Sequence, residues 1–383
     1  MRLISIAIAS AISTATLLFA AGAACAGPFD RLWVFGDSTV DTGWYNFQPS
    51  GESQFDQYLS SYNLARPPHF PPTYGIGKPT SSPGPVSVEV LAALVGTDVL
   101  PADAPLTLGE ADPNFRALVV RFPLPVPIFI GTNYATGGAR NHDVNTPTTG
   151  LFPNAVPTET QIANYLGQHE PDGQSLYLIS SGGNDVGVAN LMNNPTAYLT
   201  GVADSLAAAI LTLQQRGARY IIVTDLPESF GTAEEQSFRH LYNTELMSQL
   251  TALGVNFAWG DMNGLRQQIV ANPASFGITH TTNSLADRAC TTPDPSLGII
   301  SAWAYLCSPI SPVSKPISET FAEQALFADN EHWATGGQKL LGTYYFCLAA
   351  RTWPRLFFPF GHIPPVAVLP PPCGGNSVTA NAP

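Results

Sequence analysis

Three side chains in this chain are of the types that nucleophilic catalysis requires. Ser38 lies three residues after the apolar run Leu32–Phe35, and a serine hydroxyl becomes a good nucleophile only when a base removes its proton. His332 is a candidate base, because Asp329 stands three residues before it. That spacing lets the carboxylate accept the Nδ1–H of the imidazole and hold its tautomer. We therefore predict a nucleophile, a base and an orienting acid in these three residues.

Each of these residues also has a structural interpretation. A serine that follows an aspartate is typical of a helix cap, and His332 could be a loop histidine with a chance acidic neighbour. Glu331 is a second candidate for the orienting acid. We rank it below Asp329, because the side chains of adjacent residues diverge. The catalytic interpretation gains its support from two further polar blocks.

These two blocks contain hydrogen-bond donors suited to a developing negative charge, which acyl transfer must stabilise. The first contains Gly137-Gly138, where the absence of a Cβ lets a backbone N–H approach a substrate closely. The second is Gly182–Asp185, in which the Asn184 amide donates without titrating. Taken one at a time, the glycine pair is a plain turn and Asn184 is a strand-end cap. Those alternatives stay open for each block alone.

The blocks occur in the order that characterises a known family. The chain contains, in sequence, Phe35–Gly43 (FGDSTVDTG), Asn133–Ala139 (NYATGGA), Gly182–Asp185 (GGND) and Asp329–His332 (DNEH). In this respect it resembles the GDSL or SGNH family of esterases and lipases. The resemblance extends through Gly84–Glu89 and Gln161–Ala163 and covers the mature chain up to about Gly342. Gly-Asp-Ser alone is a weak motif, whereas four blocks in order are a specific one.

The resemblance implies a catalytic apparatus residue by residue. Carboxylic esters would be hydrolysed through an acyl-enzyme on Ser38, with no cofactor and no metal. His332 would move the proton, and Asp329 would orient it. The oxyanion hole would consist of the backbone N–H groups of Ser38 and Gly138 and the side-chain amide of Asn184.

The substrate is less well specified than the reaction. Thr39 replaces the leucine that gives the family its name, and Trp44 replaces an asparagine of many members, so the acyl pocket could be reshaped. Proline-rich loops between residues 64 and 130 carry aromatic side chains that either line an acyl groove or pack as surface loops: Phe70, Tyr74, Phe122 and Phe129. We expect a small-molecule or lipid ester with a short-chain or lipid acyl group. A polysaccharide O-acetylesterase and a catalytically silent secreted binding protein are the alternatives.

The elements that must position these residues alternate between strands and helices. Continuous apolar runs, typical of strands buried on both faces, occur at residues 32–35, 176–179 and 220–223, and residues 255–258 are predicted to form another short strand. Helical patterns occur at 198–216, at 232–253 behind a capping box of Thr232 and Glu235, and at 335–347. This alternation predicts an α/β fold. We expect the flavodoxin-like, three-layer α/β/α sandwich of SGNH hydrolases, with a central parallel sheet and its site at the carboxyl ends of the strands.

The first 26 residues have the pattern of a signal peptide. Arg2 is followed by the apolar run Leu3–Phe19 and by the small-residue site Ala24-Cys25-Ala26. We predict cleavage after Ala26 and export, either to the periplasm or out of the cell. An uncleaved anchor and a lipidated Cys25 are the alternatives. No later segment reads as a membrane span, so we expect no transmembrane segment in the mature chain.

The cysteines fit an exported protein. Cleavage leaves an even number, typical of disulfides outside the cytosol: Cys290, Cys307, Cys347 and Cys373. Three connectivities are possible, and the simplest pairs neighbours in the sequence. Residues 27–355 would then form the hydrolase domain. Residues 356–383 would form a proline- and glycine-rich tail, attached to the domain by a Cys347–Cys373 bond.

The charge of the chain excludes one class of partner. The formal net charge is −12, and only 11% of residues are charged. An acidic protein without a cluster of lysines and arginines repels the phosphate backbone, so we expect no nucleic-acid partner. The oligomeric state is not predicted.

Overall fold

The computed structural model describes residues 27–65, 76–103, 131–142, 152–229, 231–297 and 303–357. Three predictions lie outside this part of the chain. They are the signal peptide at 1–26, the tail beyond residue 357, and the four aromatic loop residues that are candidates for an acyl groove.

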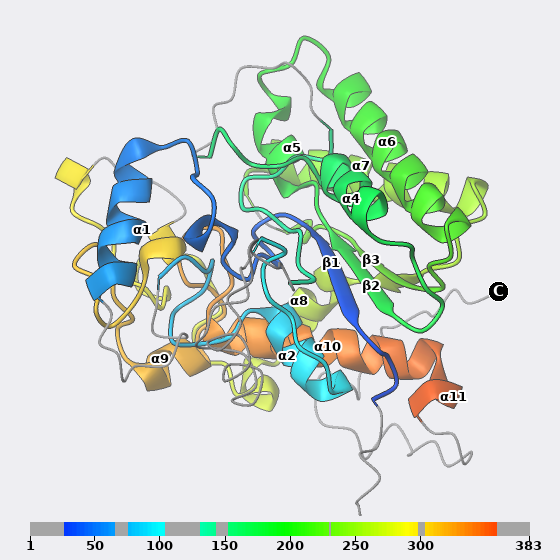
Figure 1. The fold of residues 1–383 in the computed structure, drawn as a ribbon. Coiled ribbons are helices and arrows are strands. Elements are labelled where there is room, and N and C mark those ends of the chain that lie inside the picture. Colours follow the sequence, from blue (N-terminus) through cyan, green and yellow to red (C-terminus); the bar gives the residue numbers. More distant parts are fainter. Residues whose placement is uncertain are drawn as a thin grey trace, which may run out of the picture.

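A four-stranded parallel sheet forms the centre of the molecule (Figure 1). Its strands are β1 (Leu32–Gly36), β2 (Leu176–Ser180), β3 (Tyr220–Thr224) and β4 (Ala258–Gly260), which lie side by side in sequence order. The register pairs Gly36 with Ser180, so β1 and β2 end level with one another. Residues that follow these two strands therefore emerge at the same edge of the sheet.

Helices cover both faces of the sheet, which confirms the predicted three-layer α/β/α sandwich. One face packs against α4 (Thr158–Gln168), α6 (Pro195–Gln215) and α7 (Ala233–Ala252). The other face packs against α2 (Ser87–Val95), α8 (Met262–Ala271) and α10 (Thr335–Thr352). Successive side chains of β1 alternate between the two layers: Trp33 points to the first, and Val34 to the second.

The other α-helices of the described residues are α1 (Ser53–Ala65), α5 (Gly183–Ala189), α9 (Glu319–Gln324) and α11 (Pro354–Phe357). A segment without regular strand structure also extends the sheet beside β1. Val34 donates its N–H to the Thr132 carbonyl at 3.0 Å, and Tyr134 donates to the Val34 carbonyl at 2.8 Å. Residues 132–136 therefore run beside β1 much as a fifth strand would.

The predicted elements differ from the observed ones mainly at their ends. The capping box of Thr232 and Glu235 begins α7, as predicted. The fourth strand is displaced from residues 255–258 to Ala258–Gly260. The reason is that the N–H of Val255 donates to the carbonyl of Leu250 at the end of α7. Asn256 likewise donates to a side chain of α6, so neither N–H is available to the sheet.

Among the described residues, α6 is the helix long and apolar enough to cross a membrane, with a mean hydropathy of 1.4. Its apolar residues belong to the core of the molecule: Leu206, Ile210 and Leu213 are buried against the sheet together with Ile221 of β3. A core helix of a large sheet has the same length and composition as a membrane span.

One of the two predicted disulfides lies in the described residues. Cys290 and Cys307 are bonded, with a sequence separation of 17, which confirms this pairing. Cys347 lies in α10, and Cys373 lies outside the described residues, so that pairing stays a prediction.

The Cys290–Cys307 bond should contribute measurably to stability, because it removes conformational freedom from the unfolded chain. For a loop of this length, replacing both cysteines by serine should lower the free energy of unfolding by about 3 kcal/mol. Urea denaturation of the mature protein, followed by circular dichroism, measures the change. A double variant with the wild-type midpoint and slope would contradict this expectation.

Candidate active site

Gly36, the last residue of β1, fixes where the chain leaves the sheet. A Cβ at this position would lie 1.9 Å from the Ser180 carbonyl oxygen, and the φ of +145° is one that only glycine adopts readily. Gln161 of α4 holds Gly36 from the side. Its Oε1 accepts the Gly36 N–H at 2.8 Å, and its Nε2 donates to the Gly36 carbonyl at 2.9 Å. Both peptide groups of Gly36 are therefore fixed, and with them the direction in which the chain continues toward Ser38.

Ser38 lies two residues beyond Gly36, on a turn that Asp37 organises. The Asp37 N–H donates to the Ser180 carbonyl at 3.1 Å, and Asp37 Oδ1 accepts the Thr39 N–H at 2.9 Å. Asp37 is buried, whereas Ser38 is partly exposed. The aspartate thus satisfies the backbone of the turn, and the serine is left at its surface.

His332 and Asp329 are in direct contact. The His332 Nδ1 lies 2.9 and 3.0 Å from the two carboxylate oxygens of Asp329. Asp329 is fully buried, and its oxygens also accept the backbone N–H groups of Ala304, Glu331 and His332. The carboxylate of Glu331, the competing acid, accepts instead from the side-chain amide of Asn330. Of the two acids, Asp329 is the one hydrogen-bonded to the imidazole.

These contacts also determine the charge of the pair. Burial raises the pKa of Asp329, but the charge and hydrogen bonds of His332 outweigh it and bring the pKa below its ordinary value. Burial lowers the pKa of His332, but the Asp329 carboxylate outweighs it, and the pKa rises to about 9. Glu331 and Asp37 raise it further in the same direction. A geometric connection to the serine turn runs through Tyr305, whose ring packs against the imidazole and whose hydroxyl donates to Asp41, three residues after Ser38.

The glycine pair Gly137-Gly138 reaches the same edge on the segment beside β1. Thr136 donates its N–H to the Gly36 carbonyl at 3.0 Å, so the pair begins level with the end of β1. Gly138 is partly exposed and has a φ of +78°. A Cβ on Gly137 would lie 1.9 Å from the hydroxyl oxygen of Tyr305. Both positions therefore favour glycine, one by its conformation and the other by close approach.

Asn184 enters from the first turn of α5, shortly after β2. Its Nδ2 donates to the Ala139 carbonyl at 2.9 Å, and an amide nitrogen carries a second hydrogen for another acceptor. The next residue, Asp185, accepts the Asn141 N–H at 2.9 Å. These two bonds join α5 to the segment that follows Gly138, so the two candidate oxyanion donors lie on connected segments.

Three residues that hold this arrangement carry no sequence-based prediction: Asp41, Gln161 and Tyr305. Gln161 and Asp41 lie in blocks that carry the family resemblance, and that was the available signal. Tyr305 lies in none of them. Its ring packs edge-on against the His332 imidazole, with 5.7 Å between centroids. Its place beside the candidate base becomes apparent only in the folded chain.

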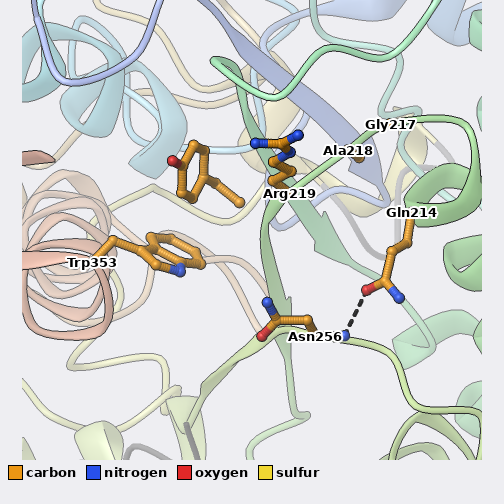
Figure 2. Close-up of a pocket in the computed structure, with 7 residues that line it drawn as sticks. Gln214, Gly217, Ala218, Arg219, Asn256 and Trp353 are labelled. Atoms are coloured by element: carbon orange, nitrogen blue, oxygen red, sulfur yellow. Dashed lines mark hydrogen bonds between the residues drawn. The ribbon is translucent and has the colours of Figure 1, made fainter. Parts of the chain in front are cut away.

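A cavity of about 570 Å³ lies at the opposite edge of the sheet (Figure 2). Tyr220, Arg219 and Trp353 are among its lining residues, and the N–H of Asn256 donates to Gln214 Oε1 there at 2.6 Å. Tyr220 is the first residue of β3, whereas the candidate catalytic residues follow the ends of β1 and β2. The length of the strands therefore separates this cavity from the candidate active site.

Known proteins resemble most of this chain. It is 24% identical over 358 residues to the esterase EstA of Pseudomonas aeruginosa, a match that covers 88% of this chain and 49% of that protein. An uncharacterized Pseudomonas putida protein of the trpE-trpG intergenic region is 24% identical over 359 residues, with 88% and 51% covered. The chain thus spans about half the length of these two relatives. A GDSL esterase/lipase of Arabidopsis thaliana is 26% identical over 293 residues, with 66% and 72% covered.

A family model also matches the chain. The model described as GDSL-like Lipase/Acylhydrolase matches residues 32–258. This range includes Ser38, Gly138 and Asn184, whereas Asp329 and His332 lie beyond its end. The match covers more than half of the 383 residues, and it confirms the resemblance predicted from the sequence blocks. The chain therefore belongs to the GDSL-like lipase/acylhydrolase family.

Proposed function

We propose that this protein is an exported carboxylic ester hydrolase that acts through an acyl-enzyme on Ser38. The observation that carries the proposal is the buried His332–Asp329 pair, whose imidazole packs against Tyr305, which in turn donates its hydroxyl to Asp41, three residues after Ser38. Relatives named esterase or lipase support the same reaction class. The sequence of residues 1–26 and the Cys290–Cys307 bond support export.

In the proposed mechanism, His332 Nε2 removes the Ser38 Oγ proton while Oγ attacks the carbonyl carbon of the ester. Asp329 holds Nδ1–H and stabilises the imidazolium. The imidazolium then gives its proton to the departing alcohol, which leaves the acyl-enzyme. Water, deprotonated by the same imidazole, attacks the acyl carbon and restores the serine. The cycle requires no cofactor.

The negative charge of each tetrahedral intermediate would be shared among three donors. Two are the backbone N–H groups of Ser38 and Gly138, and the third is the N–H of the Asn184 amide that does not face Ala139. Each donor is held by the fold before substrate binds, which is why such groups stabilise a transition state more than water does.

For the substrate we propose an ester with an apolar acyl group. A cluster of buried aromatic rings, Tyr45, Phe55, Phe152 and Tyr305, lies beside the glycine pair. A Cβ on Gly138 would lie 3.2 Å from the ring of Phe152. A ring in contact with the glycine that carries a proposed oxyanion donor would provide an apolar wall for the acyl group.

Hydrolysis of p-nitrophenyl esters from acetyl to palmitoyl tests the reaction and the acyl preference together. We expect turnover by the mature protein and its loss in Ser38→Ala, because no other hydroxyl occupies the nucleophile's position. A fluorophosphonate probe should label the wild-type protein and leave the variant unlabelled. Equal turnover in both proteins would refute the assignment of Ser38. Activity on acetylated glycans alone would favour the polysaccharide alternative, and neither labelling nor turnover would favour a silent binding protein.

The reaction should depend on pH through His332. The base must be neutral to accept a proton, and its pKa of about 9 leaves it protonated in the free enzyme at neutral pH. The value of kcat/KM should therefore rise about tenfold per unit up to pH 9 and then level off. Initial rates measured across this pH range, with Ser38→Ala as the blank, define the rising limb of the pH profile. In Asp329→Asn, which lacks the carboxylate that raises this pKa, the limb should move to lower pH. An unmoved limb would show that another group titrates.

The side chain of Asn184 should act on the rate rather than on substrate affinity. Removing one oxyanion donor costs about two to three orders of magnitude in kcat, so we expect a loss of this size in Asn184→Ala. Steady-state kinetics with a short-chain ester measure it. Asn190→Ala is the matched control, since Asn190 is exposed at the other end of α5. Wild-type kcat in Asn184→Ala would remove this residue from the oxyanion hole.

A further inference from the structure

Gly137 is held at both of its peptide groups, the one before it and the one after it. The Gly137 N–H donates to Asp41 Oδ2 at 3.0 Å, and the Tyr45 hydroxyl donates to the Gly137 carbonyl at 2.6 Å. Asp41, Tyr45 and Gly137 are buried, whereas Gly138 is partly exposed. Gly137 lacks a side chain, so these contacts, together with the packing of Tyr305, determine its orientation.

The orientation of the Gly137 carbonyl decides where the Gly138 N–H points. The two groups belong to one planar peptide, and in a trans peptide they point in opposite directions. The one cis peptide of the described residues is Ser82-Pro83, so this peptide is trans. A hydroxyl that fixes the carbonyl on one side therefore fixes the N–H on the other.

Asp41 anchors this arrangement to the serine turn. Its Oδ1 accepts the N–H groups of Gly43 and Trp44 at 2.7 and 2.8 Å. Its Oδ2 accepts the Tyr305 hydroxyl at 3.0 Å in addition to the Gly137 N–H. Burial raises the pKa of Asp41 to about 6, against the opposing effect of these donors. At neutral pH it is therefore a carboxylate, which only accepts hydrogen bonds.

Tyr305 connects the same carboxylate to the candidate base. Its hydroxyl contacts Asp41, and its ring lies edge-on to His332. Burial and neighbouring charges raise the pKa of Tyr45 and of Tyr305 well above the ordinary value. Both phenols therefore stay protonated donors throughout the working range of an esterase.

We propose that Tyr45 and Asp41 are positioning residues. They hold the carbonyl and the N–H of Gly137, and in this way they point the N–H of Gly138 at the oxyanion. This inference rests on the proposed ester hydrolase function and adds the groups that orient one donor of its oxyanion hole. It also explains why a buried tyrosine points its hydroxyl at a glycine carbonyl in the midst of an aromatic cluster.

The variant Tyr45→Phe tests the proposal, because it removes one oxygen and keeps the ring. We expect kcat to fall about tenfold to a hundredfold, the usual cost of a misaligned catalytic group, while KM changes less than about threefold. Affinity for a boronic acid, which forms a tetrahedral adduct with the serine, should fall by a similar factor. Titration with a fluorophosphonate corrects each rate for the fraction of active protein.

Tyr177→Phe is the matched control. Tyr177 is a fully buried tyrosine whose hydroxyl accepts the Asp172 N–H at 2.9 Å, in the first half of β2 and away from the candidate site. We expect it to lower the melting temperature as much as Tyr45→Phe does, with kcat and boronate affinity unchanged. A loss of kcat in both variants would indicate a general effect of buried hydroxyl removal and would overturn the proposal.

Asp41→Asn gives an independent decision, also if Tyr45→Phe fails to fold. The amide can keep an oxygen toward Gly43 and Trp44, but it then presents an NH₂ group to the Gly137 N–H. We expect the same loss of kcat and of boronate affinity. Wild-type kcat in a folded variant of either residue overturns the inference alone. A wild-type protein that hydrolyses no ester and takes up no probe overturns the proposed function and this inference with it.

Discussion

The candidate site depends on how closely β1 approaches β2 at its last residue. At Gly36 the backbone lies where any side chain would meet the Ser180 carbonyl, and Gln161 hydrogen-bonds both of its peptide groups. Three chain segments consequently end level at one edge of the sheet. Ser38 and Gly138 lie two residues past this edge, beyond Gly36 and Thr136, and Asn184 lies four residues beyond Ser180. The rigid sheet thus fixes the positions of the turns, and the turns carry the candidate catalytic groups.

Buried carboxylates hold the turns that lie beyond the hydrogen-bonded part of the sheet. Beyond the strand ends, backbone N–H groups have no ladder partner and must still be satisfied. Asp37, Asp41, Asp185 and Asp329 are all buried, and each accepts at least one of these groups. In a chain with only 11% charged residues, acids are thus concentrated beneath its candidate site. Only Asp329 faces the imidazole, and the others shape the backbone.

Local pattern explains what could be predicted from the sequence. The apolar runs predict β1, β2 and β3, and a three-residue spacing predicts the contact between Asp329 and His332. The fourth strand is displaced because hydrogen bonds to two helices, which no periodicity encodes, occupy Val255 and Asn256. Tyr305 was not predicted for the same reason: its position depends on the path of a long irregular segment. The roles of the site residues stay predictions, since geometry alone does not measure a rate.

The order of the functional groups along the chain has a consequence for biosynthesis. The candidate nucleophile, the glycine pair and Asn184 all lie in the first half of the sequence, and β4, the last strand of the described residues, ends at residue 260. The candidate base follows only at His332, after the disulfide-bonded segment in which the backbone N–H of Ala304 donates to Asp329. A ribosome therefore makes all four strands of the described residues before it makes the candidate base. A chain that ends before residue 329 would lack the candidate base and also α10, which packs against one face of the sheet.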